Sequence, residues 1–264
     1  MNNIKCILLD IDNTLTNKNE EISNETIEYF NRNLKGYYTI LVTGRTNRYA
    51  VEKSKICSAS PIVISDNGAI IYNYEEDKVL YNNFFNSKVI KKIWEISQKN
   101  NIDCVFNTIY KRYRNNIYMN DEYLKNNNIG INSIDELQDN VSQIVLFSNN
   151  EIEYNKCLND IKILKNVEVS NKGQENDGRY FADLNVTGTS KGKAIIELYK
   201  FLNITKENSI CFGDSSNDIT MFEQSGYKVA MKNSTEAIKK LADSITEFSN
   251  NENGVIKFLK KYLK

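Results

Sequence analysis

The 264-residue sequence contains no histidine. This absence excludes Ser-His-Asp and Cys-His catalysis, imidazole metal sites and proton transfer by histidine. Acid–base chemistry near neutral pH would therefore have to use carboxylates, lysine, tyrosine or cysteine. A mechanism that combines carboxylates with magnesium is compatible with this composition.

The chain also lacks an excess of charge of either sign, since Lys+Arg and Asp+Glu each number 34. A neutral chain has no overall field to attract nucleic acid or an acidic membrane surface. No run approaches the ~18 consecutive apolar residues of a membrane helix, and the N-terminus lacks the apolar stretch of a signal peptide. We therefore expect no nucleic-acid partner and no membrane partner, and we expect a monomer or weak homodimer.

The sequence has few cysteines, and none of them form a CxxC pair. Two of the five lie inside apolar runs, and an odd number of scattered cysteines does not suit a disulfide framework. Free, buried thiols in a reducing compartment are the expected state, which predicts a cytoplasmic protein. The five are Cys6, Cys57, Cys104, Cys157 and Cys211.

An apolar strand near the N-terminus leads directly into two carboxylates, Asp10 and Asp12. The loop that follows such a strand can direct both side chains at one small volume. Two anions held this close call for a cation, which indicates a divalent metal site. The pair also offers a nucleophile and a proton donor side by side.

Two other interpretations of this stretch stay open on the motif alone. Asp and Asn are common in turns after strands, where they need no chemistry. The segment also half-matches a calcium loop, with Asp10, Asp12, Thr14 and Glu21 at ligand positions, but Leu15 stands where that loop needs glycine.

Apolar and amphipathic segments alternate in both terminal parts of the chain, which predicts a parallel sheet with right-handed crossovers. About a hundred residues of different character separate these parts and read as an inserted α/β domain. The predicted fold is α/β, with a Rossmann-like parallel-sheet core at 1–82 and 185–264 and the inserted domain at 83–184. In the core, strands are expected at 4–9, 38–42, 61–65, 69–74, 78–82, 209–212, 227–231 and 244–246, and helices at 24–34, 45–56, 191–202, 217–224, 235–241 and 254–263.

Ligands of open parallel sheets bind at the carboxyl ends of the strands. Four predicted strands end in small, hydroxylic, amide or acidic residues. Asp214 and Asp218, four residues apart, could complete an oxygen-only magnesium shell with Asp10. Thr43 can donate its hydroxyl to a phosphoryl oxygen, and Lys191 supplies a positive charge for a phosphoryl transition state. Each residue alone is also compatible with a turn or a solvated side chain.

The order of these segments resembles the haloacid dehalogenase superfamily, in its Cof-like branch with a large α/β cap. The resemblance rests on DIDNT at 10–14, TGR at 43–45, DNGA at 66–69, SKGKA at 190–194 and GDSSND at 213–218, and on the tail from Met221 to Val255. It covers about two-thirds of the chain, and the inserted domain matches by position and size only. One departure is Asn13, where many relatives have glycine, and this departure predicts a tighter loop.

The resemblance implies a magnesium-dependent phosphatase of small phosphorylated metabolites, such as sugar phosphates or phosphorylated cofactors, that acts through an aspartyl-phosphate. It implies that Asp10 is the nucleophile and that Asp12 is the general acid and then the base. It further implies that the phosphoryl group is held by Thr43, Gly44, Lys191 and Asn217, and that Mg²⁺ is held by Asp10, Asp12 (through its backbone carbonyl), Asp214 and Asp218.

Two alternatives to this function remain. A sugar phosphomutase shares the carboxylate pair and the cap class, and a phosphometabolite sensor could use the same fold without catalysis. The inserted domain should set the substrate. Its densest basic cluster, Lys111-Arg112-Tyr113-Arg114, could bind a second anionic group, but a solvated strand or turn is the favoured interpretation.

Overall fold

The computed structural model describes residues 3–116, 122–175 and 177–263. The chain divides into two compact units. The first, here called the core unit, comprises the chain up to Tyr81 and again from Ser190 onward, and the second, the inserted unit, spans Asn82–Thr189.

The core unit is built on an eight-stranded sheet with the order β14-β13-β12-β1-β2-β3-β4-β5. The strands from β14 to β3 are parallel, and β4 runs antiparallel to β3. The strands expected at 69–74 and 78–82 are β4 and β5, which lie side by side at this edge. The strands span Cys6–Leu9 (β1), Tyr38–Val42 (β2), Ile62–Ser65 (β3), Ile70–Asn73 (β4), Lys78–Asn82 (β5), Ser209–Gly213 (β12), Tyr227–Ala230 (β13) and Ser244–Ile245 (β14).

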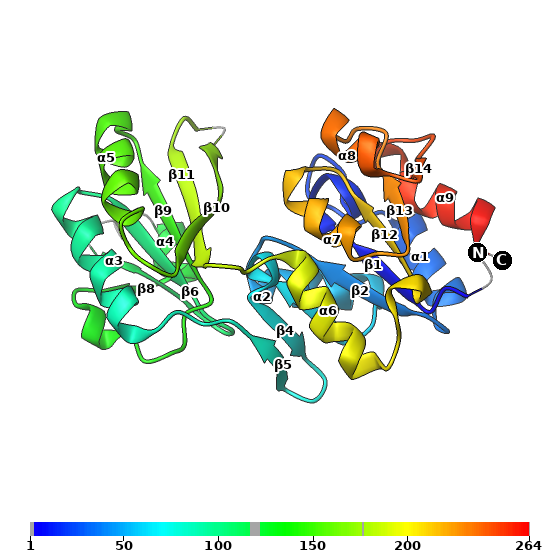
Figure 1. Ribbon diagram of the computed structural model, residues 1–264, viewed down its shortest axis with the longest axis horizontal. Helices are drawn as coiled ribbons and strands as arrows, with labels where there is room; N and C mark the ends of the chain where they lie inside the picture. Colours follow the sequence, from blue (N-terminus) through cyan, green and yellow to red (C-terminus); the bar gives the residue numbers. More distant parts are fainter. Residues whose placement is uncertain (1–2, 117–121, 176, 264) are drawn as a thin grey trace. The chain divides into compact units, whose positions relative to one another are not determined.

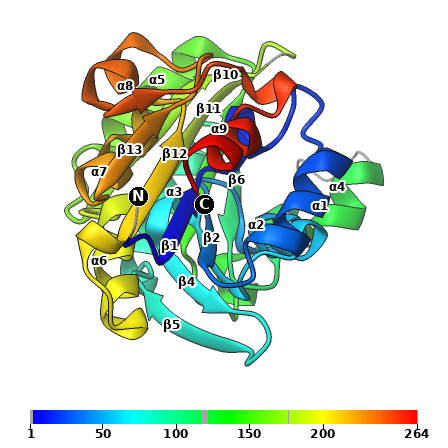
Figure 2. The same ribbon diagram turned by 90° about the vertical axis from the view of Figure 1, so that its right-hand side faces the viewer.

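Helices cover both faces of this sheet, so that its central strands are buried on each side (Figure 2). On one face, α6, α7 and α8 pack against a cluster that includes Leu8, Ile40, Leu198 and Phe222. The opposite face carries α1, α2 and α9, where Phe258 meets Phe212 edge to face. The helices span Asn24–Asn33 (α1), Asn47–Cys57 (α2), Lys191–Leu202 (α6), Ile219–Glu223 (α7), Glu236–Leu241 (α8) and Gly254–Tyr262 (α9).

One helix boundary differs from the expectation in a way that matters for the site. Helix α2 was expected to begin at Arg45, but it begins at Asn47 because Thr46 acts as its N-cap, with a side chain that accepts from the backbone N–H of Tyr49. Arg45 therefore lies in the loop after β2, at the carboxyl edge of the sheet.

The inserted unit contains a six-stranded sheet with the order β10-β11-β9-β6-β7-β8. Helices α3 and α5 lie along one of its faces and bury an apolar cluster that includes Ile93, Phe106 and Leu158 (Figure 1). Strands β8 and β11 and helix α4 were not predicted, and β7 lies where the sequence favoured a strand or a turn. The elements span Ser87–Lys99 (α3), Asp103–Asn107 (β6), Arg112–Asn115 (β7), Glu122–Asn127 (α4), Ile129–Ile131 (β8), Gln143–Ser148 (β9), Glu151–Ile161 (α5), Val167–Gln174 (β10) and Tyr180–Val186 (β11).

Three of the four residues of the basic cluster, Arg112 to Arg114, lie on strand β7, and the cluster is only partly solvated. Tyr113 packs into the apolar cluster. Arg114 is 5% exposed and forms an ion pair with the buried Asp103 on β6. The interpretation of the whole cluster as solvated is therefore wrong for Arg114, whose charge is neutralised inside the unit.

None of the helices in the described residues has the length and hydropathy that crossing a membrane requires.

Candidate active site

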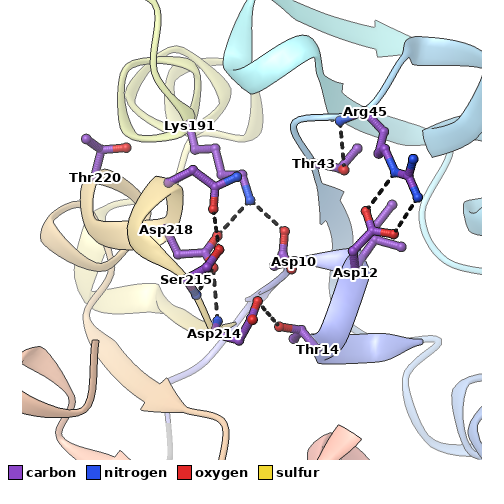
Figure 3. Close-up of polar contacts among 12 residues, drawn as sticks. Asp10, Asp12, Thr14, Thr43, Arg45, Lys191, Asp214, Ser215, Asp218 and Thr220 are labelled. Carbon is purple, nitrogen blue, oxygen red and sulfur yellow. Dashed lines mark hydrogen bonds and ion pairs between the residues drawn. The ribbon is translucent and has the colours of Figure 1, made fainter. Parts of the chain in front are cut away.

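The carboxyl ends of four neighbouring strands supply the residues singled out in the sequence. Strand β1 pairs with β12 and β2, and β2 pairs with β3, all in parallel. Their carboxyl ends therefore lie at one edge of the sheet, where the loops after β1, β2 and β12 meet the first turn of α6 (Figure 3).

Lys191 stands between two carboxylates at the start of α6. Its Nζ donates to Oδ1 of Asp10 at 2.6 Å and to Oδ1 of Asp218 at 2.7 Å. The lysine is 1% exposed and Asp218 fully buried, so each charge depends on the others for compensation. Burial disfavours the charged form of Lys191 and by itself would lower its pKa. The combined effect of the two carboxylates is larger, so the pKa of Lys191 is raised. Lys191 is therefore a fixed positive charge at the side chain of Asp10.

Asp218 is held by the backbone of its own loop. Its Oδ2 accepts from the N–H groups of Asp214 and Ser215 at 3.0 and 3.2 Å. The expected helix from 217 to 224 begins only at Ile219, and a tight turn precedes it. A Cβ on Gly213 would stand 2.7 Å from Cγ of Asp218, so this turn requires glycine. Both oxygens of Asp218 are engaged by the protein, which suits an orienting role.

Three carboxylates gather at this point. Asp10, Asp214 and Asp218 each offer an oxygen, and these oxygens lie within 4.8 Å of one another. Burial and the charge of Asp218 raise the pKa of Asp214 to about 7. The same two causes raise the pKa of Asp10, although Lys191 opposes them.

The acidic group therefore carries more negative charge than Lys191 balances. A divalent cation would remove this excess, and a donor set made only of oxygen atoms is what Mg²⁺ prefers. Thr14 donates from Oγ1 to Oδ1 of Asp214 at 3.4 Å, and Lys191 uses only one oxygen of Asp10. The residues present thus fit a magnesium ion.

The side chain of Asp12 faces away from this acidic group (Figure 3). Its two oxygens accept from Arg45 Nε and Nη2, both at 3.3 Å, and Oδ1 also accepts from the hydroxyl of Tyr49 at 2.9 Å. Asn13, the next residue, has a left-handed backbone with φ of 58°. The loop turns sharply there, which agrees with a tighter loop at this position.

Of the four predicted phosphate-binding residues, Lys191 begins α6, and the other three lie in the loops after β2 and β12. Thr43 is buried, and its hydroxyl accepts from the N–H of Arg45 at 3.1 Å, which leaves the hydroxyl hydrogen for a further acceptor. A Cβ on Gly44 would stand 2.7 Å from the amide oxygen of Asn67, so the loop after β3 packs closely here. Asn217 accepts from the hydroxyl of Ser215 at 2.8 Å.

Sequence reasoning did not assign two residues that contact Asp12. Arg45 belongs to the TGR segment at 43–45, so the sequence marked the residue, but it did not show that Asp12 is its partner. Tyr49 lies in the first turn of α2, just after the loop that carries Arg45. No feature of the sequence marked it.

A family model described as haloacid dehalogenase-like hydrolase matches residues 7–259. Among proteins, the chain is 29% identical to a 5-amino-6-(5-phospho-D-ribitylamino)uracil phosphatase of Bacillus subtilis, over 98% of this chain and 96% of the relative. It is 25% identical to a phosphoglycolate phosphatase of Sulfurisphaera tokodaii, over 97% of this chain and 93% of the relative.

Solved structures agree with this assignment. A haloacid dehalogenase-like hydrolase from Bacteroides thetaiotaomicron superposes with a TM-score of 0.85 at 25% identity, covering 98% of this chain and 99% of the other. A sugar phosphatase of HAD subclass IIB superposes with a TM-score of 0.76 at 25% identity, covering 98% of both chains. The predicted fold and enzyme class are confirmed, and the chain belongs to the haloacid dehalogenase-like hydrolases as a phosphatase of that family.

Proposed function

We propose that the protein is a magnesium-dependent phosphatase of small phosphorylated metabolites that works through an aspartyl-phosphate on Asp10. The observation that supports this most directly is the contact of Asp10 with Lys191 inside the acidic group. A carboxylate held beside a buried ammonium, with a second carboxylate two residues away, supplies an attacking oxygen, a counter-charge and a proton carrier.

In the first proposed step, a carboxylate oxygen of Asp10 attacks the phosphorus atom and the bond from phosphorus to the ester oxygen breaks. Protonated Asp12 gives its proton to that departing oxygen, so the product leaves as an alcohol. Thr43, Gly44 and Asn217 bind the phosphoryl oxygens, and Lys191 balances the charge that develops on them.

In the second step, water attacks the phosphorus of the aspartyl-phosphate. Asp12, now ionised, takes a proton from that water, and the bond between phosphorus and the Asp10 oxygen breaks. Inorganic phosphate leaves, and Asp10 and Asp12 return to their starting states. Each turnover therefore consumes one water and needs no other reactant.

The magnesium ion would be held by Asp10, Asp214 and the backbone carbonyl of Asp12, with Asp218 orienting this set. When bound, it supplies positive charge to the phosphoryl oxygens. Asp218 suits its part because its carboxylate is already fixed by Lys191 and by two backbone N–H groups.

For the substrate we propose small phosphorylated metabolites such as sugar phosphates or phosphorylated cofactors. The named relatives act on a phosphorylated ribitylaminouracil and on phosphoglycolate, and one structural neighbour is a sugar phosphatase. We assign phosphoryl transfer to the core unit and recognition of the organic part to the inserted unit as its cap. We also propose a cytoplasmic location, supported by five free, buried cysteines, and a monomer or weak homodimer.

The test is a screen of phosphorylated metabolites and a generic aryl phosphate for release of inorganic phosphate, with and without Mg²⁺. Asp10→Asn serves as the blank, because it keeps the shape of the side chain and removes the nucleophile. We expect magnesium-dependent release by the wild type and none by the variant. Equal rates for the two proteins, or slow release that requires a sugar bisphosphate, would contradict a phosphatase with this nucleophile.

A further inference from the structure

The carboxylate of Asp12 is held by two residues that have not been given a part so far. Arg45 donates to both of its oxygens, through Nε and Nη2, each at 3.3 Å. Tyr49 donates its hydroxyl to Oδ1 at 2.9 Å. Within the part of the chain that the structure describes, these two account for every bond to the Asp12 side chain, so they alone fix its direction.

Arg45 is itself fixed from its other side. Its Nη2 forms an ion pair with Glu20, and its guanidinium carbon lies 4.9 Å from the centre of the Tyr49 ring. The guanidinium is planar and binds carboxylates through two nitrogens, so its contacts determine an orientation as well as a charge. Arg45 therefore bridges Asp12 and Glu20 while it rests on Tyr49.

Glu20 is held in place by its backbone. Its carbonyl accepts from the Nζ of Lys53 on α2 at 2.7 Å, and its N–H donates to the carbonyl of Asn17 at 3.0 Å. The residue has a left-handed backbone with φ of 59°, which surrounding contacts must maintain. The backbone of Glu20 is thus fixed, and its carboxylate gives Arg45 a second acidic partner besides Asp12.

The carboxylate of Asp12 needs this support because none of its described hydrogen bonds comes from its own loop. The side chain is partly exposed, and the next residue turns the chain through a left-handed conformation. A proton donor must lie within hydrogen-bond reach of the departing oxygen, and a displacement of about 1 Å can cost roughly a hundredfold in rate. An unsupported Asp12 would explore several rotamers.

We propose that Arg45 and Tyr49 are positioning residues that hold Asp12 in place as proton donor to the leaving group, with Glu20 orienting Arg45. This inference rests on the proposed function. The loop after β2 would then have two separate roles, since Thr43 binds phosphate and the Arg45 side chain positions Asp12. The hydrogen bond between these two residues involves only the backbone N–H of Arg45.

The test compares two substrates that differ in how much they need the proton. An alkyl phosphate such as glycerol phosphate has a poor leaving group, whereas p-nitrophenyl phosphate leaves readily as its anion. Values of kcat/KM are measured because they report only the steps up to departure of the first product. Later hydrolysis of the phosphoenzyme, in which Asp12 also acts, does not enter them.

We expect Arg45→Gln to lower kcat/KM for glycerol phosphate by roughly ten- to a hundredfold, and for p-nitrophenyl phosphate by less than about threefold. Tyr49→Phe should show the same selectivity with a smaller loss. Glu20→Gln, which leaves both Asp12 contacts in place, should show a still smaller loss of the same kind. Arg45→Lys should restore part of the activity on glycerol phosphate, because it keeps the charge but loses the two-nitrogen contact.

Two reference variants make the result decisive. Arg48→Gln changes an exposed arginine on α2, next to Tyr49, and should leave kcat/KM for both substrates unchanged. Asp12→Asn should show the full selective loss. Equal losses of both substrates in Arg45→Gln, or no loss, would overturn the positioning role while Asp12→Asn still supports the proposed function. Absence of phosphatase activity in the wild type would instead overturn the proposed function.

Discussion

Asp10 and Asp12 are separated by a single residue, yet among the described residues their carboxylates share no hydrogen-bond partner. Asp10 is bonded to Lys191 and belongs to the buried acidic group, whereas Asp12 is bonded to Arg45 and Tyr49 at the rim of the site. Two positive charges thus serve two acids independently. Because the contacts are separate, substitutions at Lys191 and at Arg45 can be interpreted independently of each other.

Replacement of Lys191 by methionine is expected to affect both activity and stability. It removes the ammonium that contacts both Asp10 and Asp218 and leaves these two buried carboxylates uncompensated. The rate should fall by about a hundred- to a thousandfold, and the free energy of unfolding without metal should fall by about 3–5 kcal/mol. Phosphate release and urea unfolding measure the two effects.

A less than tenfold loss of rate in Lys191→Met would contradict the charge-balancing role. Lys193→Met is the matched control, since Lys193 is exposed on the same helix. It should retain wild-type rate and stability.

Magnesium is expected to stabilise the folded protein, because the acidic group is over-charged without it. A ligand at a hundred times its dissociation constant adds about 2.7 kcal/mol to the free energy of unfolding. A rise in melting temperature on titration with MgCl₂, reversed by a chelator, would show this. Asp214→Asn should abolish most of the rise, and Asp135→Asn, at an exposed site in the inserted unit, should not.

The magnesium prediction has a readout that is independent of catalysis. If Asp10→Asn and the wild type both lack any magnesium-dependent shift in melting temperature, the acidic group does not bind the ion. A shift of equal size in Asp214→Asn would place the ion elsewhere.

Breaking the Asp103–Arg114 pair in the inserted unit should be more harmful than replacing it. Arg114→Met leaves a buried carboxylate without its partner and should cost about 3–5 kcal/mol at neutral pH. The double variant Asp103→Leu with Arg114→Met should recover much of this loss. Chemical unfolding of the three proteins tests the order.

The cost of Arg114→Met should shrink as the pH falls. Burial raises the pKa of Asp103 above its ordinary value even with Arg114 present. The folded state therefore holds this proton more tightly than the unfolded chain, and its contribution to stability is lost as the pH rises through the raised pKa. Without Arg114 the carboxylate is protonated in acid and the penalty disappears. A cost that grows in acid would contradict this sign.

Gly68 is expected to tolerate no side chain, and the effect should reach Lys191. Its φ is 96°, and a Cβ there would stand 2.2 Å from the carbonyl oxygen of Ser190, which precedes Lys191. Gly68→Ala should therefore destabilise the protein by more than about 1 kcal/mol and reduce kcat. Gly178→Ala isolates the backbone term, because Gly178 has φ of 89° but open space around it. It should cost less than Gly68→Ala and leave kcat unchanged.

The core sheet and its helices could be predicted closely because their local signals agree. The prediction for α6 has the same bounds as the helix, and Ser190 caps it as expected of a serine at a helix start. Strand β11 was missed, and β7 could be placed only as a strand or a turn. Two arginines interrupt the apolar pattern of β7, and Arg114 can be buried there only because Asp103 on β6 neutralises it.

The sequence predicted which residues form the site, but it predicted only part of how their side chains are arranged. Spacing after strands identifies Asp10, Lys191 and Asp214, because parallel strands must end at one edge. The direction of Asp12 depends on contacts with Glu20 and Tyr49 through one arginine, and such contacts follow from rotamers that no sequence period encodes. Residues 217 and 218 were read as the start of the following helix, but they belong to the turn before it, because the four-residue spacing of Asp214 and Asp218 occurs in both.

Asparagine takes the place of glycine at many turns of this chain. Among the described residues, ten non-glycine residues have a positive φ. Six of them are asparagines, and Asn13 is one of the six. An asparagine has fewer backbone states than glycine when the chain is unfolded, so it loses less entropy on entering the turn. A polar, asparagine-rich composition thereby becomes a source of thermal stability. It lets the loop that carries Asp10 and Asp12 bend sharply without the freedom that glycine would give it.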